Sequence, residues 1–453
     1  MTLRTLFLST TLLITSMTSS TLAVDQDYGV SKSGAVKADT LMEEAVLSLD
    51  NVIAYAIKDN PELNSSARNV DLAIEDIDLA MADYRPDVMA MGEINHIQRD
   101  NDLSSEWESG TEKTASLSVE QPLYRGGQTS AAVARQESFK SASENRFFGD
   151  VQNKIVDVVF VYMATLTADQ ALKVNADNVN LLEEQLKATR ARFEAGELTK
   201  TDVAQAEASL QQAKAEMAQS NAAYQVALSA FREETGLTDL AIELDYPEIS
   251  EEELPESLDS ALIMGMERNP DIIAANAIVR GFYEDVREKE GAFLPQITAG
   301  AGVTLSRDPA FSQLDRQETA NMRVTASIPL YQGGVLRNQL RQSKIQKFQA
   351  KDDYEAVKRA LTDEIISAWE EYRAVKVQID AREAQLKASR LAYEGVKLEE
   401  QVGSRSILDV LDANQDVRDA ELDLLQAKQD MVNAYYNLLG AVGLLDYSLW
   451  DKS

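Results

Sequence analysis

The chain has 453 residues, of which 75 are acidic and 44 are basic, and its formal net charge is −31. A chain this acidic lacks the basic surface that nucleic acid requires, so we expect no nucleic-acid partner. Cysteine is absent and histidine occurs once, at His96, which removes most thiol and metal-site chemistry; no cofactor is expected.

Residues 1–23 are predicted to form a secretory signal peptide. Arg4 gives a basic start, residues 6–13 form a short apolar run, and small residues lead to a cleavage point near Ala23. The alternative is a membrane anchor, but the run is shorter than the ~20 residues that a bilayer requires. No later segment reads as apolar enough to cross a membrane as a helix, so we expect an exported protein without a transmembrane helix.

The rest of the chain repeats itself. The pattern Pro-Leu-Tyr-x-Gly-Gly occurs at 122–127 and again at 329–334, and Asn-Pro occurs at 60–61 and at 269–270. Offsets of about 207 and 209 residues predict two tandem copies of one unit, which is far too long for a solenoid repeat. The expected division is a first repeat over 24–244, an acidic linker over 245–257, a second repeat over 258–447 and a short tail over 448–453.

Apolar and polar residues alternate between the prolines of each repeat, which indicates strands. We expect one hairpin at about 86–123 and another at about 295–330, with polar surface loops at 99–113 and 306–319. An apolar face about ten residues long suits a tilted strand in an outer membrane. A soluble hairpin with one face on a core remains the alternative.

Four strands cannot close a membrane barrel, which begins at about eight. An open edge in lipid would leave backbone groups unpaired, so membrane insertion requires several copies. Two copies would give a filled barrel of eight strands, and three would give twelve strands with room for a pore.

The Pro-Leu-Tyr-x-Gly-Gly motif is predicted to join each hairpin to a helix. Proline cannot donate to the strand ladder and should end the strand, tyrosine suits an aromatic belt at the headgroups, and the glycines permit a tight bend. The joint residues are Pro122, Tyr124, Gly126, Gly127, Pro329, Tyr331, Gly333 and Gly334.

Long helices are expected at about 128–235 and 335–442, each with a short break at a glycine, Gly196 or Gly403. At 1.5 Å per residue, the helix before each break could reach roughly 100 Å. The helices after the breaks carry an alanine-rich coiled-coil seam. The fold class is therefore mainly α with a small β part, and helices this long form a wall rather than a compact core.

Together these features resemble the TolC family of outer-membrane channel proteins. The resemblance rests on the signal peptide, the tandem halves, the paired joints, and the segments AGELTKTDVAQAEA (195–208) and GSRSILDVLDA (403–413). It implies a homotrimer with a twelve-stranded barrel in the outer membrane and a twelve-helix tunnel in the periplasm, serving efflux or type I secretion. It also implies two partners, a periplasmic adaptor (membrane fusion) protein and an inner-membrane transporter, either an RND pump or an ABC exporter.

The resemblance places Asp409 and Asp412 at the narrow periplasmic entrance. Two aspartates three residues apart share one face of a helix, and six carboxylates in three copies would favour cations. The alternative is that both remain solvated and stabilise the helix dipole.

The resemblance also implies that Asp202 and Arg405, each assigned to the turn before a helix, hold the entrance closed. An exposed ion pair contributes about 0–1 kcal/mol, which suits a latch that must open. The chain departs from the family where a tyrosine stands three residues before the glycine, because it has Glu400 there. Gly196 and Gly403 resemble the tips that contact the adaptor, with plain turn residues as the alternative.

Two other functions are alternatives to a channel. A soluble periplasmic coiled-coil scaffold or adaptor-like protein would need no apolar band on its hairpins. An exported enzyme would need a nucleophile with its base, a metal-ligand spacing or a phosphate loop, and no such cluster is recognised, so we expect no enzyme. The exported cargo is not indicated.

Overall fold

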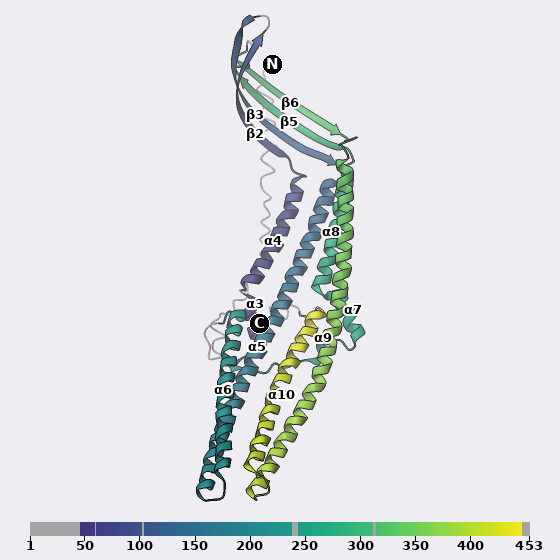
Figure 1. Ribbon diagram of the computed structural model, residues 1–453. Helices are drawn as coiled ribbons and strands as arrows, with labels where there is room; N and C mark the ends of the chain where they lie inside the picture. Colours follow the sequence, from purple (N-terminus) through teal and green to yellow (C-terminus); the bar gives the residue numbers. More distant parts are fainter. Residues whose placement is uncertain (1–45, 59, 102–103, 238–242, 311–313, 446–453) are drawn as a thin grey trace.

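The computed structural model describes residues 46–58, 60–101, 104–237, 243–310 and 314–445. The predicted signal peptide and most of the predicted tail lie outside these residues. The described chain is long and narrow, with a four-stranded sheet at one end and two helical hairpins at the other (Figure 1). Most of it is helical, as the sequence predicts.

The sheet contains two hairpins, β2 (Asp87–Asn101) with β3 (Ser104–Arg125), and β5 (Gln296–Arg307) with β6 (Arg316–Ser327). The order is β2-β3-β5-β6 and every neighbouring pair is antiparallel. The register aligns apolar residues on one face, because Val119 lies opposite both Val88 and Ala301, and Ala301 lies opposite Met322. Within the described chain, β2 and β6 are the edges of this sheet.

The two strands of the first hairpin are longer than predicted, and the loop between them is shorter. Residues 99–113 were expected to form a loop, but β2 continues to Asn101 and β3 begins at Ser104, with Arg99 paired to Glu108. The polar sequence misled the prediction, because a two-stranded ribbon with solvent on both faces needs no apolar face. The second loop prediction is closer, since residues 308–315 do separate β5 from β6.

Two shorter helices precede each hairpin. They are α3 (Leu49–Lys58) and α4 (Pro61–Ala82) in the first half, and α7 (Leu258–Arg268) and α8 (Pro270–Gly291) in the second. Asn60 and Asn269 cap α4 and α8 through their side chains, and proline occupies the first helical position. An Asn-Pro pair therefore begins a new helix instead of continuing the old one.

The long helices α5 (Gln128–Glu194) and α9 (Val335–Gln401) each run for 67 residues without interruption. Each turns at its tip into a shorter partner, α6 (Lys200–Thr235) or α10 (Ile407–Ala441). Near the middle of the molecule, β1 (Val46–Leu47) pairs in parallel with β4 (Glu243–Leu244), and η1 (Glu251–Glu253) lies in the acidic segment between the halves.

The central core joins the two halves. Ile53, Tyr162, Phe231, Ile365 and Leu438, from α3, α5, α6, α9 and α10, are all fully buried in one cluster. Among the described helices, α5 alone has a segment apolar enough to cross a membrane by length and composition, so the expectation that no later segment is so apolar was wrong. The same helix supplies much of this core, which gives its apolar residues a role in packing.

The two joints use paired glycines in the left-handed region. Gly126 and Gly127 have φ of 64° and 79°, and Gly333 and Gly334 have φ of 60° and 87°. A Cβ on Gly126 would lie 2.3 Å from the carbonyl oxygen of Gly291, at the end of α8. These bends therefore require glycine.

The prolines of the two joints occupy different positions relative to their strands. Pro329 follows the end of β6, whereas Pro122 lies within β3, which continues to Arg125 past a register shift between Pro122 and Tyr124. The prediction that Pro122 ends the strand was wrong, because an irregular ladder position tolerates a residue without an N–H donor. Tyr124, in the last part of β3, and Tyr331, after the end of β6, are both exposed.

Candidate functional site

The tips of the two helical hairpins lie together at the end farthest from the sheet (Figure 1). Gly196 and Gly403 follow the long helices with φ of 82° and 80°. In each tip the next residue donates its N–H to a carbonyl within the helix, Glu197 to Arg192 and Ser404 to Glu399. This pattern ends a helix at glycine, so both tips are compact turns with defined geometry.

Each returning helix starts with a capping box. The hydroxyl of Thr199 accepts a hydrogen bond from the N–H of Asp202, whose carboxylate accepts one from the N–H of Thr199. Ser406 and Asp409 form the same arrangement at the start of α10. The sequence prediction placed Asp202 in the turn that corresponds to Arg405. The structure places it inside α6, at the position that Asp409 holds in α10.

These hydrogen bonds favour the ionised carboxylates. The pKa of Asp409 is lowered first by the hydroxyl of Ser406 and then by its N–H. The pKa of Asp202 is lowered first by the N–H of Thr199 and then by its hydroxyl. Both carboxylates therefore stay negative at neutral pH. Asp412 lies almost one helical turn beyond Asp409 and is exposed, so the two carboxylates lie near the same face of α10.

Arg405 does not contact Asp202 within one chain. Its Nε donates to Oε2 of Glu399 at 3.1 Å, and its Nη1 lies 3.9 Å from Oδ1 of Asp409. Among the described residues of the single chain, no ion pair joins Asp202 to Arg405. Glu399 stands six residues before Arg405, across the glycine turn, and no sequence pattern marked it as a partner.

A second ion pair at the tips connects the two halves directly. Nη1 of Arg192, near the end of α5, donates to Oε1 of Glu400, near the end of α9, at 2.6 Å. The Glu400 side chain is 9% exposed, and Nε of Arg192 also donates to Glu197 at 3.4 Å. The hydrogen bond from Glu400 is the main cause that raises the pKa of Arg192. Glu400 stands where the resemblance implies a tyrosine, so the sequence singled out this position but not its partner Arg192.

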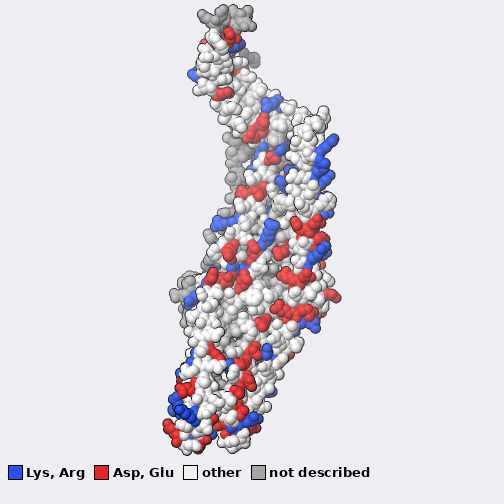
Figure 2. All heavy atoms as spheres, viewed as in Figure 1, with Lys and Arg blue, Asp and Glu red and all other residues white. Residues whose placement is uncertain are grey.

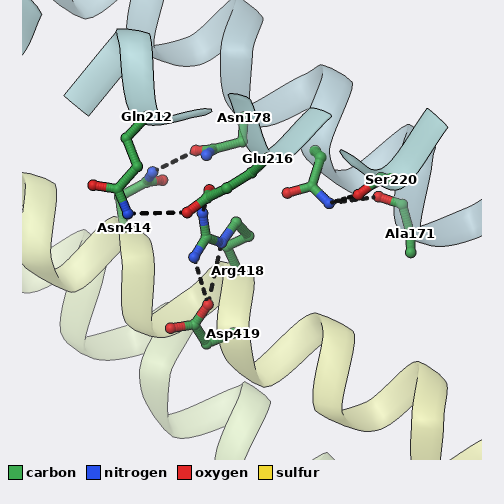
Figure 3. Close-up of polar contacts among 9 residues, drawn as sticks. Ala171, Asn178, Gln212, Glu216, Ser220, Asn414, Arg418 and Asp419 are labelled. Atoms are coloured by element: carbon green, nitrogen blue, oxygen red, sulfur yellow. Dashed lines mark hydrogen bonds and ion pairs between the residues drawn. The ribbon is translucent and has the colours of Figure 1, made fainter. Parts of the chain in front are cut away.

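Above the tips, polar side chains form a layer between the hairpins (Figure 3). Asn414 on α10 donates to Asn178 on α5 at 2.8 Å. Arg418 on α10 is paired with Glu216 on α6 and with Asp419 at 2.7 Å. The Arg418 side chain is 12% exposed, so its pairing with Glu216 is shielded from water. This layer adds polar links to the apolar packing of Ile407 and Leu411 against α5 and α6.

An open groove of about 550 Å³ lies beside this layer, between α5, α9 and α10. Its lining is mixed, with Leu181 and Leu386 among the apolar residues and Asp177, Arg390 and Glu421 among the charged ones. Arg390 is paired with Glu421 at 2.6 Å across α9 and α10. The groove has the character of a surface between packed helices and holds no convergent set of catalytic groups.

Comparison with known proteins gives the same architecture. The model of a family described as "Outer membrane efflux protein" matches residues 52–237 and 264–444, one segment in each half. The outer membrane efflux protein BepC of Brucella suis is 32% identical over 405 residues, covering 89% of this chain and 87% of BepC. The outer membrane protein TolC of Escherichia coli is 24% identical over 417 residues, covering 88% and 83%.

Solved structures agree at the level of the fold. The CmeC outer membrane channel of Campylobacter jejuni has a TM-score of 0.78 at 17% identity, with 89% of each chain covered. A membrane protein from Pseudomonas aeruginosa also has a TM-score of 0.78, at 21% identity, with 87% of this chain and 90% of that chain covered.

Proposed function

Because the chain belongs to the outer membrane efflux protein family, we propose that three copies of this outer-membrane efflux channel close into one exit duct. The duct has a barrel of twelve strands in the membrane and a tunnel of twelve helices in the periplasm. Each copy contributes the four strands of its sheet and the four helices α4, α5, α8 and α9 directly below them. The tips of the hairpins form the entrance.

The observation that carries this proposal is the pair of open edges, β2 and β6. Strand directions alternate across the sheet, so β6 of one copy can pair with β2 of the next in the same antiparallel manner. Open edges are not viable in lipid, and four strands are too few to close alone. Three copies give twelve strands and leave room for a pore.

The internal repeat supplies a template for the contact between copies. Inside the chain, α5 packs on α8 below the paired strands β3 and β5. Nη1 of Arg135 lies 2.8 Å from Oδ1 of Asp285, and Phe139 packs directly on Gly281. Applying the repeat offsets of 207 and 209 residues to this contact replaces α5 by α9 and α8 by α4. The repeat therefore predicts that α9 of one copy packs on α4 of the next. Leu72 and Leu79 on α4 and Ile345 on α9 are 63%, 70% and 59% exposed, and this contact would cover them.

Cysteine pairs offer a direct test, because the chain has no cysteine of its own. By the repeat offsets, Leu72 and Gln346 correspond to Gly281 and Phe139, which are in direct contact inside the chain. The double variant Leu72→Cys with Gln346→Cys should therefore form disulfides between neighbouring chains. Non-reducing electrophoresis of outer membranes should then show a covalent trimer in high yield.

The matched control is Leu72→Cys with Lys387→Cys, which moves the second thiol about 60 Å down the same helix. This control should remain monomeric on the same gel. A dimer as the largest species from Leu72→Cys with Gln346→Cys, or equal cross-linking in both variants, would contradict the trimer and its proposed interface. Mass measurement of the wild-type protein in detergent checks the copy number independently.

We further propose that the tips form a gated entrance. Asp409 and Asp412 from three copies line its narrowest part, and Asp202 and Arg405 link neighbouring copies in the closed state. Gly196 and Gly403 mark the turns that contact a periplasmic adaptor, which couples the duct to an inner-membrane transporter of the RND or ABC type. In this proposal each copy is organised as two tandem repeats, 24–244 and 258–447, with the linker 245–257 between them.

In this scheme the Arg192–Glu400 pair takes the place of the missing tyrosine link. Replacing Glu400 by glutamine removes the charge while keeping the size of the side chain, so the tips of α5 and α9 should separate more readily. Single-channel recordings in planar bilayers should show longer openings, with an open probability raised severalfold because the pair is partly exposed.

The same substitution at Glu394→Gln provides the control, because Glu394 is exposed on α9 two turns above the tip. Its recordings should match the wild-type protein. Wild-type gating in the Glu400→Gln channel would show that this ion pair does not hold the entrance.

A further inference from the structure

A stripe of basic residues marks the first part of α9, directly below the sheet. From Val335 to Lys351 the sequence has five basic residues and no acidic residue, in a chain with a net charge of −31. Figure 2 shows Lys and Arg side chains gathered along this edge of the molecule. The counterpart in the first half, residues 128–144, is balanced, with two basic and two acidic residues. The basic residues of the stripe are Arg337, Arg341, Lys344, Lys347 and Lys351.

Three of these residues lie within reach of a headgroup layer that begins at the start of α9. At 1.5 Å per residue, Arg337, Arg341 and Lys344 begin about 3, 9 and 14 Å below the start of α9. A headgroup region adds about 5–8 Å on each side of the hydrocarbon core, and long basic side chains extend towards it. Lys347 and Lys351 lie deeper, and both contact the ring of Tyr283 on α8.

The three upper residues of the stripe, Arg337, Arg341 and Lys344, have no strong partner among the described residues of the chain. Among the described residues, neither Arg337 nor Arg341 is paired with a carboxylate, and Arg341 donates to the side chain of Asn338. Lys344 lies 3.7 Å from Glu290 on α8, with 46% of the lysine side chain exposed. These cations are therefore available to a ligand outside the chain.

The stripe lies on a solvent-exposed side of α8 and α9. Lys347 contacts the ring of Tyr283, which is 44% exposed, and Lys344 lies near Glu290, whose side chain is 53% exposed. Asp285, on nearly the opposite side of α8, is covered instead by its ion pair with Arg135 on α5, and its side chain is 12% exposed. The stripe is therefore turned away from the contact between α5 and α8 and is open to solvent.

Apolar side chains lie directly above the stripe. Leu330 and Tyr331, between the end of β6 and the start of α9, are 93% and 83% exposed. Leu330 continues the alternation that places Met322 and Val324 on the apolar face of the sheet. Exposed apolar and aromatic residues above exposed cations match the order of layers at a membrane surface, from hydrocarbon to headgroup.

We propose that Arg337, Arg341 and Lys344 bind the headgroups of anionic phospholipids in the periplasmic leaflet of the outer membrane. The proposal rests on the proposed function, because it needs the sheet to lie in that membrane. Phosphate groups accept charge-assisted hydrogen bonds from arginine, and basic clusters beside a membrane attract anionic lipids. In a trimer the three stripes would fix the depth of the joint and hold a ring of anionic lipid around it.

The test counts bound lipids on the intact protein. Wild-type protein in detergent is titrated with phosphatidylglycerol or phosphatidylcholine, and native mass spectrometry records the lipids retained by each mass-selected species. We expect a preference for phosphatidylglycerol that the variant Arg337→Glu, Arg341→Glu, Lys344→Glu loses, with affinity falling on the order of 100-fold. If this charge-reversed variant does not assemble, a milder variant with glutamine at the same three positions takes its place. It should also lose the preference for phosphatidylglycerol.

The control variant is Lys358→Glu, Arg359→Glu, Lys387→Glu. It changes the same number of exposed charges on the same helix, about 35 Å or more below the joint. This variant should keep the wild-type preference. No preference in the wild-type protein, or an equal loss in the control, would overturn the proposal. Wild-type protein that retains phosphatidylglycerol as a monomer would contradict the trimer and leave the lipid site standing.

Discussion

Replacing Gly126 by valine will prevent the bend between β3 and α5 from forming. A side chain there costs about 1–2 kcal/mol for the left-handed backbone. Forcing atoms against Gly291, where a Cβ would lie 2.3 Å from the carbonyl oxygen, adds about 1–3 kcal/mol. We expect little folded protein in the outer membrane and almost no heat-resistant oligomer, measured by fractionation and electrophoresis.

Two matched variants separate the causes. Gly236→Ala places a side chain at a similar φ of 75°, where a Cβ would have no neighbour within 4 Å, and should retain most of the wild-type yield. Gly333→Val alters the equivalent joint in the second half. There the residue equivalent to Gly291 is Ala82, which in the proposed trimer belongs to a neighbouring copy. This variant should leave a folded monomer that assembles poorly. Normal oligomer from Gly126→Val would show that this joint can be rebuilt without glycine.

Replacing both entrance aspartates will remove the preference of the channel for cations. In the proposed trimer, Asp409 and Asp412 bring six carboxylates to one constriction, and a ring of carboxylates favours cations. Asparagine is the better replacement, because its amide oxygen can still accept the hydrogen bond that caps α10. We expect Asp409→Asn with Asp412→Asn to lower the cation-to-anion permeability ratio, and the sensitivity to divalent cations, by about an order of magnitude.

Reversal potentials in a salt gradient across a planar bilayer measure this ratio. The control is Asp352→Asn with Asp353→Asn, which removes the same charge from exposed residues near the other end of α9. It should leave the selectivity close to that of the wild-type channel, because charges more than a Debye length from the entrance are largely screened. If the entrance variant keeps its selectivity, Asp409 and Asp412 serve only as residues at the start of a helix.

The architecture was readable from the sequence wherever the governing pattern is local. Period-two alternation identified both hairpins, and the glycines at 196 and 403 indicated where the long helices α5 and α9 end. The capping residues Thr199 and Ser406 were less visible, because a capping box looks like ordinary polar sequence until the start of the helix is known. Asp202 was therefore assigned to a turn instead of to the first turn of α6.

Contacts between the halves could not be predicted in the same way. Arg192 and Glu400 are 208 residues apart, and their pairing depends on how two helices of 67 residues pack along their full length. A single residue of rotation in either helix would turn one partner away from the other. The same holds for Arg418 and Glu216, whose shielded contact follows from the apolar packing beside it.

The unbroken length of α5 and α9 makes the chain a lever. The central core holds both helices near their midpoints, at Ile155 and Ile365, and leaves an arm of roughly 55 Å between that fulcrum and each tip. A tilt of a few degrees about the fulcrum then displaces the tip by several ångströms, while each peptide bond along the arm hardly changes. Leverage of this kind lets a weak force at one end move the other, with the energetic cost confined to the few contacts that oppose the rotation.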